Sequence, residues 1–214
     1  FATPASIAAA KQASKRKGVL EGQEMGRVFA WMRPNDLVWN YWVNNYLMGN
    51  PPPVFDILYW NNDTTRLSAG LHSDFLDLYL TNGLVEGTLE ALGTPVDLGK
   101  VSCDSFVVAG YTDHIIPWDG AYRTTQVMGG DSTFVLSTGG HIQAILNPPD
   151  NPKAAYLVSE TLPPTADEWR ERATQVAGSW WSAWHAWLAA RSGEMVRARK
   201  RLGNAAHPPL DPAP

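Results

Sequence analysis

Two short apolar runs rich in β-branched residues, 105–109 and 133–137, place the strongest constraint on the fold of this 214-residue chain. Each run ends in a glycine-containing turn that carries a chemically active side chain, Asp113 after the first run and His141 after the second. Such runs are typical of parallel strands buried on both faces. The stretch 117–128 between them, with proline near its start, predicts a helix. A strand–helix–strand unit forms a right-handed crossover, which brings both carboxyl ends to one edge of the sheet.

An aspartate and a histidine at neighbouring strand ends can form the acid–base half of a catalytic triad. The neutral imidazole accepts a proton from a nucleophile, and the carboxylate on its other nitrogen fixes the tautomer and stabilises the imidazolium. The order nucleophile, acid, histidine is that of the α/β-hydrolase fold. The alternative is that Asp113 caps a turn and His141 is a surface histidine. Order, spacing and flanking strands together favour the triad.

The sequence contains no recognisable nucleophile turn, since neither Gly-x-Ser-x-Gly nor Gly-x-Cys-x-Gly occurs in it. Cys103 has Val101 and Ser105 at the positions of the two glycines and stands at the start of a predicted strand, so we predict a buried structural thiol. His114, beside Asp113, is predicted to be a surface or structural histidine rather than a catalytic one. The other histidines have no partner pattern, and no spacing resembles a metal site: His72, His185 and His207.

The composition excludes several classes of protein. Hydrophobic content of 44% and charged content of 18% are ordinary for a globular protein, and a net charge of −4 argues against a general nucleic-acid binder. One cysteine excludes an internal disulfide and fits a reducing compartment, and no apolar run reaches the ~18 residues of a membrane span. No secretory signal opens the sequence. It also lacks an initiator methionine, so we expect a piece of a longer protein. Basic clusters at 11–17 and 197–201 are typical of solvated helix faces, with attraction of an anionic ligand such as a coenzyme A phosphate as the alternative.

The remaining pattern predicts helices over 5–17, 24–32, 37–48, 73–80 and 166–190, and a strand over 55–60. The helix 37–48 is aromatic nearly all round and carries three asparagines, so we expect it between a core and a pocket. On the last helix, Trp180, Trp184 and Trp187 share a face and predict a packing stripe. Three strands are too few for a sheet covered on both sides, so we expect further strands from upstream sequence or a partner chain.

Four longer motifs carry a family resemblance. They are RPNDLVWNYWVNNYL from Arg33, FDILYWNNDTTRL from Phe55, AGYTDHIIPW from Ala109, and GHIQ from Gly140 followed by Asn147-Pro148-Pro149. In this order they resemble the polyhydroxyalkanoate synthases, the bacterial polyester polymerases. The resemblance covers roughly residues 1–190.

The resemblance implies an acyltransferase that polymerises (R)-3-hydroxyacyl-coenzyme A thioesters into polyester and releases coenzyme A. It implies an α/β-hydrolase core, a mobile cap and a Cys–Asp–His triad, with Asp113 and His141 as its acid and base. Trp60 matches a tryptophan that lines the family's active site, and we assign Trp60 and His114 to substrate binding. We expect no cofactor, metal or nucleic acid. We also expect a homodimer in the cytoplasm, at the surface of the polyester granule and in contact with the growing chain.

On this basis we expect a helical cap over 1–52, the C-terminal part of the α/β-hydrolase core over 53–150, a helical extension over 151–202 and a disordered tail over 203–214. The family's cysteine lies in a Gly-x-Cys-x-Gly turn that this sequence lacks. We therefore expect a C-terminal portion of a synthase, inactive alone, whose oxyanion hole uses other backbone.

Two other hypotheses stay open at this point. One is an α/β-hydrolase esterase or polyester depolymerase with a serine nucleophile, and the residue in the missing turn would distinguish it from a synthase. The other is a non-enzymatic module that binds polymer granules through its Trp-rich helix. Granule binding that survives loss of Asp113 and His141 would identify that module.

Overall fold

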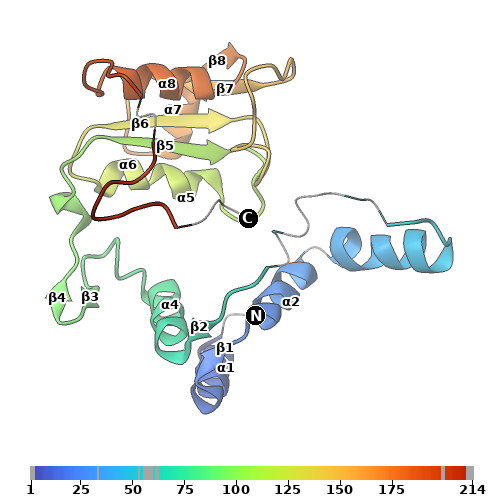
Figure 1. Cartoon of the computed structure of the whole chain (residues 1–214). Helices are drawn as coiled ribbons and strands as arrows, with labels where there is room; N and C mark the ends of the chain where they lie inside the picture. Colours follow the sequence, from blue (N-terminus) through green and yellow to red (C-terminus); the bar gives the residue numbers. More distant parts are fainter. Residues whose placement is uncertain are drawn as a thin grey trace. The chain divides into compact units, whose positions relative to one another are not determined.

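The computed structural model describes residues 3–32, 34–52, 54, 60, 63–198 and 201–210. They belong to two units, Phe1–Asp97 and Leu98–Pro214 (Figure 1). The predicted strand 55–60 lies outside the described residues, except for Trp60. None of the described helices combines the length and the apolar character that crossing a membrane requires.

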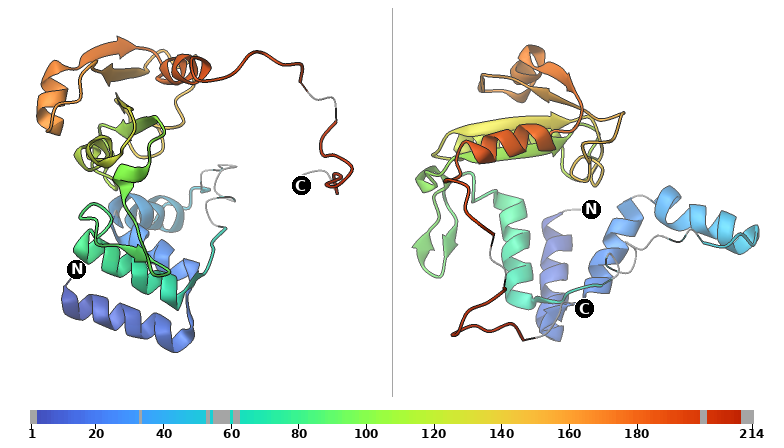
Figure 2. Two further views of the ribbon diagram at one scale, coloured as in Figure 1. Left: turned by 90° about the vertical axis from the view of Figure 1, so that its left-hand side faces the viewer. Right: turned by 45° about the horizontal axis from the view of Figure 1, so that its top comes forward.

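The first unit is built on the packing of α1 (Pro4–Lys17) against α4 (Ala69–Thr81), which lie side by side in Figure 2. Thr3 caps α1, because its side chain accepts a hydrogen bond from the backbone of the first turn and proline follows it. The helix ends where Gly18 adopts a φ of 80°, a conformation that glycine reaches without steric cost. Both predicted helices, 5–17 and 73–80, are thus confirmed.

Short strands and one buried polar contact complete the α1–α4 pair. The His72 ring lies at the interface of the two helices, with its Nδ1 atom 2.9 Å from Ser14 Oγ. The strands form two antiparallel pairs: β1 (Val19–Leu20) with β2 (Leu67–Ser68), and β3 (Glu90–Ala91) with β4 (Thr94–Pro95). These pairs are too short to carry a core of their own, so the helix packing holds this unit together.

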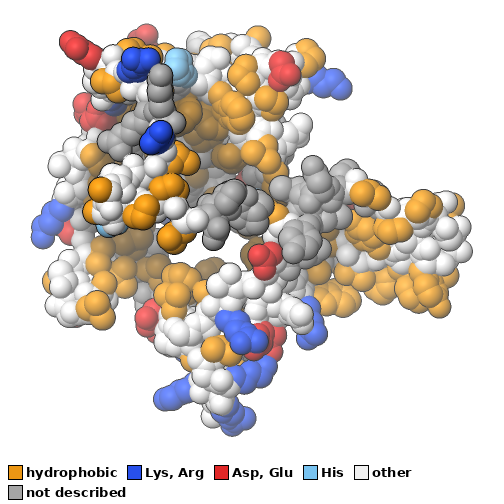
Figure 3. All heavy atoms as spheres, viewed as in Figure 1, with side chains coloured by type: hydrophobic (Ala, Val, Ile, Leu, Met, Phe, Trp, Pro, Cys, Tyr) orange, Lys and Arg blue, Asp and Glu red, His pale blue; other side chains and the backbone are white. Residues whose placement is uncertain are grey.

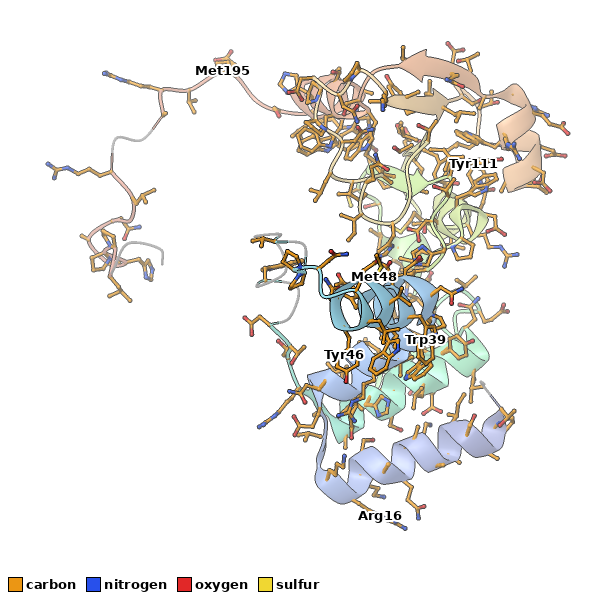
Figure 4. The ribbon with its side chains drawn as sticks, turned by 90° about the vertical axis from the view of Figure 1, so that its right-hand side faces the viewer. Arg16, Trp39, Tyr46, Met48, Tyr111 and Met195 are labelled. Carbon is orange, nitrogen blue, oxygen red and sulfur yellow. The ribbon has the colours of Figure 1, made fainter. Side chains whose placement is uncertain are left out.

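Aromatic side chains are exposed along α2 (Gly22–Met32) and the two π-helical turns that follow, η1 (Asn35–Trp39) and η2 (Trp42–Leu47). Figure 3 shows hydrophobic side chains on the surface of this segment, and Figure 4 labels Trp39, Tyr46 and Met48 on it. The predicted helix 24–32 is confirmed. The expectation that 37–48 lies between a core and a pocket is wrong for this structure, because no residue of η1 or η2 is buried.

The side chains of these exposed turns contact one another, which explains why residues 37–48 can stay outside a core. Trp42 stacks on Tyr46 with ring centroids 4.4 Å apart, a contact between residues one helical turn apart. The Asn44 amide donates to the Asn40 side-chain oxygen at 2.5 Å. Rings and amides that pair within one helix do not need a surrounding core to be satisfied.

The second unit is a four-stranded sheet in the order β5-β6-β7-β8. Strands β5 (Ser105–Gly110) and β6 (Ser132–Ser137) are parallel neighbours, which confirms the predicted pair. Strands β7 (Ala155–Val158) and β8 (Thr174–Ala177) continue the sheet antiparallel, and sequence reasoning missed both. The remaining helical elements of this unit up to β6 are short: η3 (Leu98–Lys100), α5 (Trp118–Tyr122) and α6 (Thr124–Val127).

Apolar clusters cover both faces of this sheet. On one face, Phe134 and Leu136 pack with Tyr122 of α5 and with Trp169, which is completely buried. On the other face, a second cluster gathers Val135, Tyr156 and Trp180. Alternate residues of β6 thus enter two different cores, as expected for a strand that is apolar on both faces.

The predicted helix 166–190 is wrong as a single element. The segment forms α7 (Ala166–Arg172), then β8, then α8 (Trp181–Ala189). Thr174 and Val176 favour a strand and pair with β7, and Gly178 turns the chain at a φ of 102°. The packing stripe is confirmed for Trp180 and Trp187, which both contact the Phe106 ring, whereas Trp184 is exposed.

Trp169 should contribute strongly to the stability of the second unit. We expect Trp169→Ala to lower the free energy of unfolding by about 3–5 kcal/mol, as found for large aromatic truncations in cores. Trp184→Ala, at a side chain that is 43% exposed, should cost much less. Urea unfolding of both variants measures the two effects, and equal losses would contradict the burial assigned here.

Candidate active site

The parallel strands β5 and β6 end at the same edge of the sheet (Figure 1). Asp113 and His141 meet at this edge. Asp113 lies in the turn after β5 and His141 in the turn after β6, and His141 Nδ1 is 2.9 Å from Asp113 Oδ2. The expectation that the two side chains converge is confirmed. Their catalytic roles stay a prediction.

The Asp113 side chain is largely shielded from solvent, and both of its carboxylate oxygens have partners. Its Oδ1 atom accepts hydrogen bonds from the backbone N–H groups of Ile115 at 2.8 Å and Ile116 at 3.0 Å, while Oδ2 faces His141. Burial raises the pKa of the Asp113 carboxyl, but the hydrogen bonds from Ile116, His141 and Ile115 outweigh it and hold the pKa below its ordinary value of 3.8. The carboxylate is therefore ionised at neutral pH.

An ionised Asp113 determines which nitrogen of His141 carries the proton. A carboxylate can only accept, so the His141 Nδ1–H donates to it. In the neutral ring the other nitrogen, Nε2, then has a lone pair that can accept a proton. The His141 side chain is 37% exposed and Asp113 only 9%, so the ring is accessible while its partner is shielded. This is the arrangement of a general base with its orienting acid.

Backbone contacts hold the two turns together. The Tyr111 N–H donates to Ser137 O at 2.8 Å and the Thr112 N–H to Gly139 O at 3.3 Å. Gly110, at the end of β5, allows this approach, because a Cβ there would lie 2.9 Å from both Gly139 O and the Ala144 Cβ. The acid–base pair thus rests on a rigid strand edge and on close contact between the two loops.

The other sequence-predicted residues have different positions. The His114 ring lies near the pair, with its centroid 6.4 Å from that of His141. Trp60 belongs to the first unit and is exposed. Assignment of these two residues to substrate binding stays a prediction. Within the described part of the chain, no group of three or more His, Cys, Asp or Glu side chains could hold a metal ion.

Cys103 is exposed, so the prediction of a buried thiol is wrong. It precedes β5, whereas Asp113 follows it, and a six-residue strand spans roughly 20 Å. A thiol at the opposite end of the strand does not reach His141 within this unit. The apolar preference of cysteine did not decide its burial, because the chain bends at Cys103 before entering the sheet.

Sequence reasoning missed the apolar side chains that flank the pair. Several large ones are exposed on the two turns: Tyr111, Ile116, Ile142, Ile145 and Leu146. The available signal was their position directly beside Asp113 and His141 in loops that are otherwise polar or small. Apolar side chains around a small number of polar groups are typical of ligand-binding sites.

Comparison with known proteins agrees with this geometry. A sequence profile described as alpha/beta hydrolase fold matches residues 5–148. The chain belongs to the alpha/beta hydrolase family. In this family the catalytic acid precedes the catalytic histidine in the sequence. Asp113 precedes His141 in the same way here.

Within the alpha/beta hydrolases, the chain is a homologue of poly(3-hydroxyalkanoate) polymerases. It is 56% identical over 215 residues to poly(3-hydroxyalkanoate) polymerase 2 of Ectopseudomonas oleovorans, a match that covers 100% of this chain and 38% of the relative. It is 40% identical over 198 residues to the poly(3-hydroxyalkanoate) polymerase subunit PhaC of Cupriavidus necator, covering 92% of this chain and 34% of the relative. The chain therefore spans well under half the length of these relatives.

The lowered pKa of Asp113 predicts a pH-dependent contribution to stability. The ionised carboxylate stabilises the folded state above the ordinary value of 3.8, and this contribution is lost as the pH falls through the lowered native value. The difference in unfolding free energy between the protein and its Asp113→Asn variant should therefore be largest above pH 3.8 and shrink on acidification. Urea unfolding of both proteins from about pH 6 to about pH 2 measures it, and a difference that grows on acidification would contradict the assignment.

Proposed function

We propose that this chain supplies the acid and the base of a polyester synthase, an acyltransferase that polymerises (R)-3-hydroxyacyl-coenzyme A and releases coenzyme A. The observation that carries the proposal is the 2.9 Å contact between His141 Nδ1 and Asp113 Oδ2 at adjacent strand ends. The 56% identity to a poly(3-hydroxyalkanoate) polymerase supports the substrate class. Because the chain covers 38% of that relative, the part of such a polymerase outside the matched region is long enough to contain the nucleophile.

In the proposed reaction a cysteine from outside this chain is the nucleophile. His141 Nε2 takes the thiol proton, and the thiolate attacks the thioester carbonyl carbon. When the tetrahedral intermediate collapses, the bond to the coenzyme A sulfur breaks, and the leaving thiolate takes the proton from the His141 imidazolium. The acyl group is now a thioester of the enzyme. Asp113 stabilises the imidazolium in each step through its hydrogen bond to Nδ1.

Chain growth uses the same pair in a second step. His141 removes the proton from the 3-hydroxyl group of a second 3-hydroxyacyl unit. The oxygen of this hydroxyl group attacks the carbonyl carbon of the enzyme-bound acyl group and forms an ester bond. The cysteine leaves as a thiolate and recovers the proton from the imidazolium. The oxyanion that forms in each step requires backbone N–H donors, and in this fold one of them follows the nucleophile. We therefore expect residues 1–214 alone to be inactive.

Further assignments follow from the resemblance to polyester synthases and belong to the same proposal. We place Trp60 and His114 among the substrate-binding residues, with the exposed position of His114 beside His141 in support. We place the complete enzyme, a homodimer, in the cytoplasm at the surface of the polyester granule, in contact with the growing chain. The exposed apolar side chains of α2, η1 and η2 provide surface suited to such contacts.

The acid and base assignments are tested in the full-length protein. We expect His141→Ala to abolish coenzyme A release and Asp113→Asn to lower kcat by about 10³- to 10⁴-fold, as in other triads. Coenzyme A release is followed with a thiol reagent, and polymer by its mass. Near-normal turnover in either variant would remove the assignment.

Cys103→Ala provides the matched control for the nucleophile. Because Cys103 is exposed and stands at the opposite end of β5, we expect its removal to leave kcat and KM within about two-fold of the unmodified protein. Replacement of the cysteine in a Gly-x-Cys-x-Gly turn elsewhere in the full-length protein should abolish activity. A large loss on Cys103→Ala would point to a different nucleophile arrangement.

A further inference from the structure

We propose that Ser179, Trp180 and Trp181 position the catalytic base by clamping the backbone of the loop that carries it. This histidine loop, residues 139–147, follows β6 and contains His141. The inference deepens the proposed function and rests on it, because it assigns a role to residues that act only through His141. The three clamp residues stand where the chain leaves β8 and enters α8.

The clamp consists of side-chain donors that reach backbone carbonyl oxygens of the histidine loop. The three hydrogen bonds run from Trp180 Nε1 to Ala144 O at 2.7 Å, from Trp181 Nε1 to Ile145 O at 2.9 Å, and from Ser179 Oγ to Asn147 O. Ser179 Oγ also accepts a hydrogen bond from the Trp181 backbone N–H at 3.1 Å. One short segment therefore fixes the end of the loop at several points.

The hydrogen bonds within the histidine loop leave its last carbonyl groups without donors, so donors from outside the loop are needed. It forms a helix-like turn, in which the Ala144 N–H donates to Gly140 O at 2.8 Å, and the Ile145 and Leu146 N–H groups donate to Ile142 O at 3.0 and 2.9 Å. The last carbonyl groups of such a turn have no partner within it. The clamp residues supply donors to carbonyl groups at this end of the turn.

Two of the three clamp contacts lie in a dry environment. Ser179 is 4% exposed and Trp180 is 9% exposed, while the accepting residues Ala144 and Asn147 are 1% and 4% exposed. A buried carbonyl that loses its donor has no water to replace it, so these two hydrogen bonds are costly to break. The third contact, from Trp181 to Ile145, is exposed to solvent. Gly178, with a φ of 102°, makes the sharp turn that brings the clamp residues beneath the loop.

The clamp acts on His141 because the loop is held at two points on the same residue, Ala144. Its Cβ lies so close to Gly110 that a Cβ on Gly110 would be only 2.9 Å from it. Its carbonyl oxygen accepts the hydrogen bond from Trp180. His141 lies in the same turn and bonds Asp113 through its ring. A loop released from the clamp shifts that ring, and displacements of the order of 1 Å can cost about 100-fold in rate.

Trp187 provides a matched control. Its indole N–H group is buried and has no hydrogen-bond partner among the described residues. Trp187 stands on α8 beside the clamp, and its ring packs on Phe106, as does the ring of Trp180. Tryptophan-to-phenylalanine substitution removes an indole N–H at every one of these positions. It breaks a hydrogen bond to the histidine loop only at Trp180 and Trp181.

The test compares these substitutions in the full-length protein, with an (R)-3-hydroxyacyl-coenzyme A thioester as substrate. We expect Trp180→Phe to lower kcat about ten-fold, and the double variant with Trp181→Phe to approach 100-fold, with KM changed by less than about two-fold. Trp187→Phe should leave both constants within about two-fold. In the Asp113→Asn background, Trp180→Phe should lower kcat far less, because the orientation of His141 is already lost there.

Two results would overturn the clamp. One is a kcat of Trp180→Phe equal to that of Trp187→Phe, and the other is an equal fold-loss with and without Asp113→Asn. If Trp180→Phe does not fold, Trp181→Phe and Ser179→Ala are compared with Trp187→Phe in the same way. An active His141→Ala variant would remove the proposed function itself, whereas an inactive one beside a normal Trp180→Phe variant would remove the clamp alone.

Discussion

The parallel pairing of β5 and β6 is the constraint on which the site depends. Six residue pairs align the strands, from Ser105 opposite Ser132 to Gly110 opposite Ser137, so the two carboxyl ends coincide. Burial of alternate β6 residues in different cores fixes this register, because a shift by one residue would exchange the two faces. The turns that carry the acid and the base begin at matched positions for that reason. Packing thus determines the register, and the register determines the geometry of the site.

The central part of this arrangement could be predicted from the sequence. The runs 105–109 and 133–137 are apolar on both faces, which is a local signature of parallel strands. A helix-length stretch with an early proline separates them, and the crossover rule then leaves one arrangement for the two strand ends. Asp113 and His141 could be placed together because each follows its strand within a few residues. Because only a few residues separate each side chain from the end of its strand, the backbone has little freedom to place that side chain elsewhere.

The rest could not be predicted, because it depends on contacts that are not local. Thr174 to Ala177 lie between two helical stretches and form a strand through pairing with β7, which the sequence near them does not specify. The helical spacing of Trp180, Trp184 and Trp187 correctly indicated a helix, but α8 covers only Trp181–Ala189 of the predicted 166–190, and Trp184 is exposed. Residues 37–48 have apolar side chains all round, so no single face indicated where they pack. The clamp joins residues 179–181 to 144–147, a contact that only the tertiary structure reveals.

The acid–base pair is complete in its own contacts, all of which lie within residues 98–214. Two backbone N–H groups and the His141 ring keep the Asp113 carboxylate ionised despite its burial, so His141 carries its proton on Nδ1 before any nucleophile arrives. In the reaction that we propose, a thiol that approaches Nε2 would therefore meet a base whose tautomer and ring orientation are already set. The reorganisation that such a proton transfer would otherwise require is avoided, which is the physical advantage of fixing polar groups in advance of the reaction. Substitutions at this edge of the sheet should then change the rate according to how far they displace the imidazole ring, rather than according to how strongly the substrate binds.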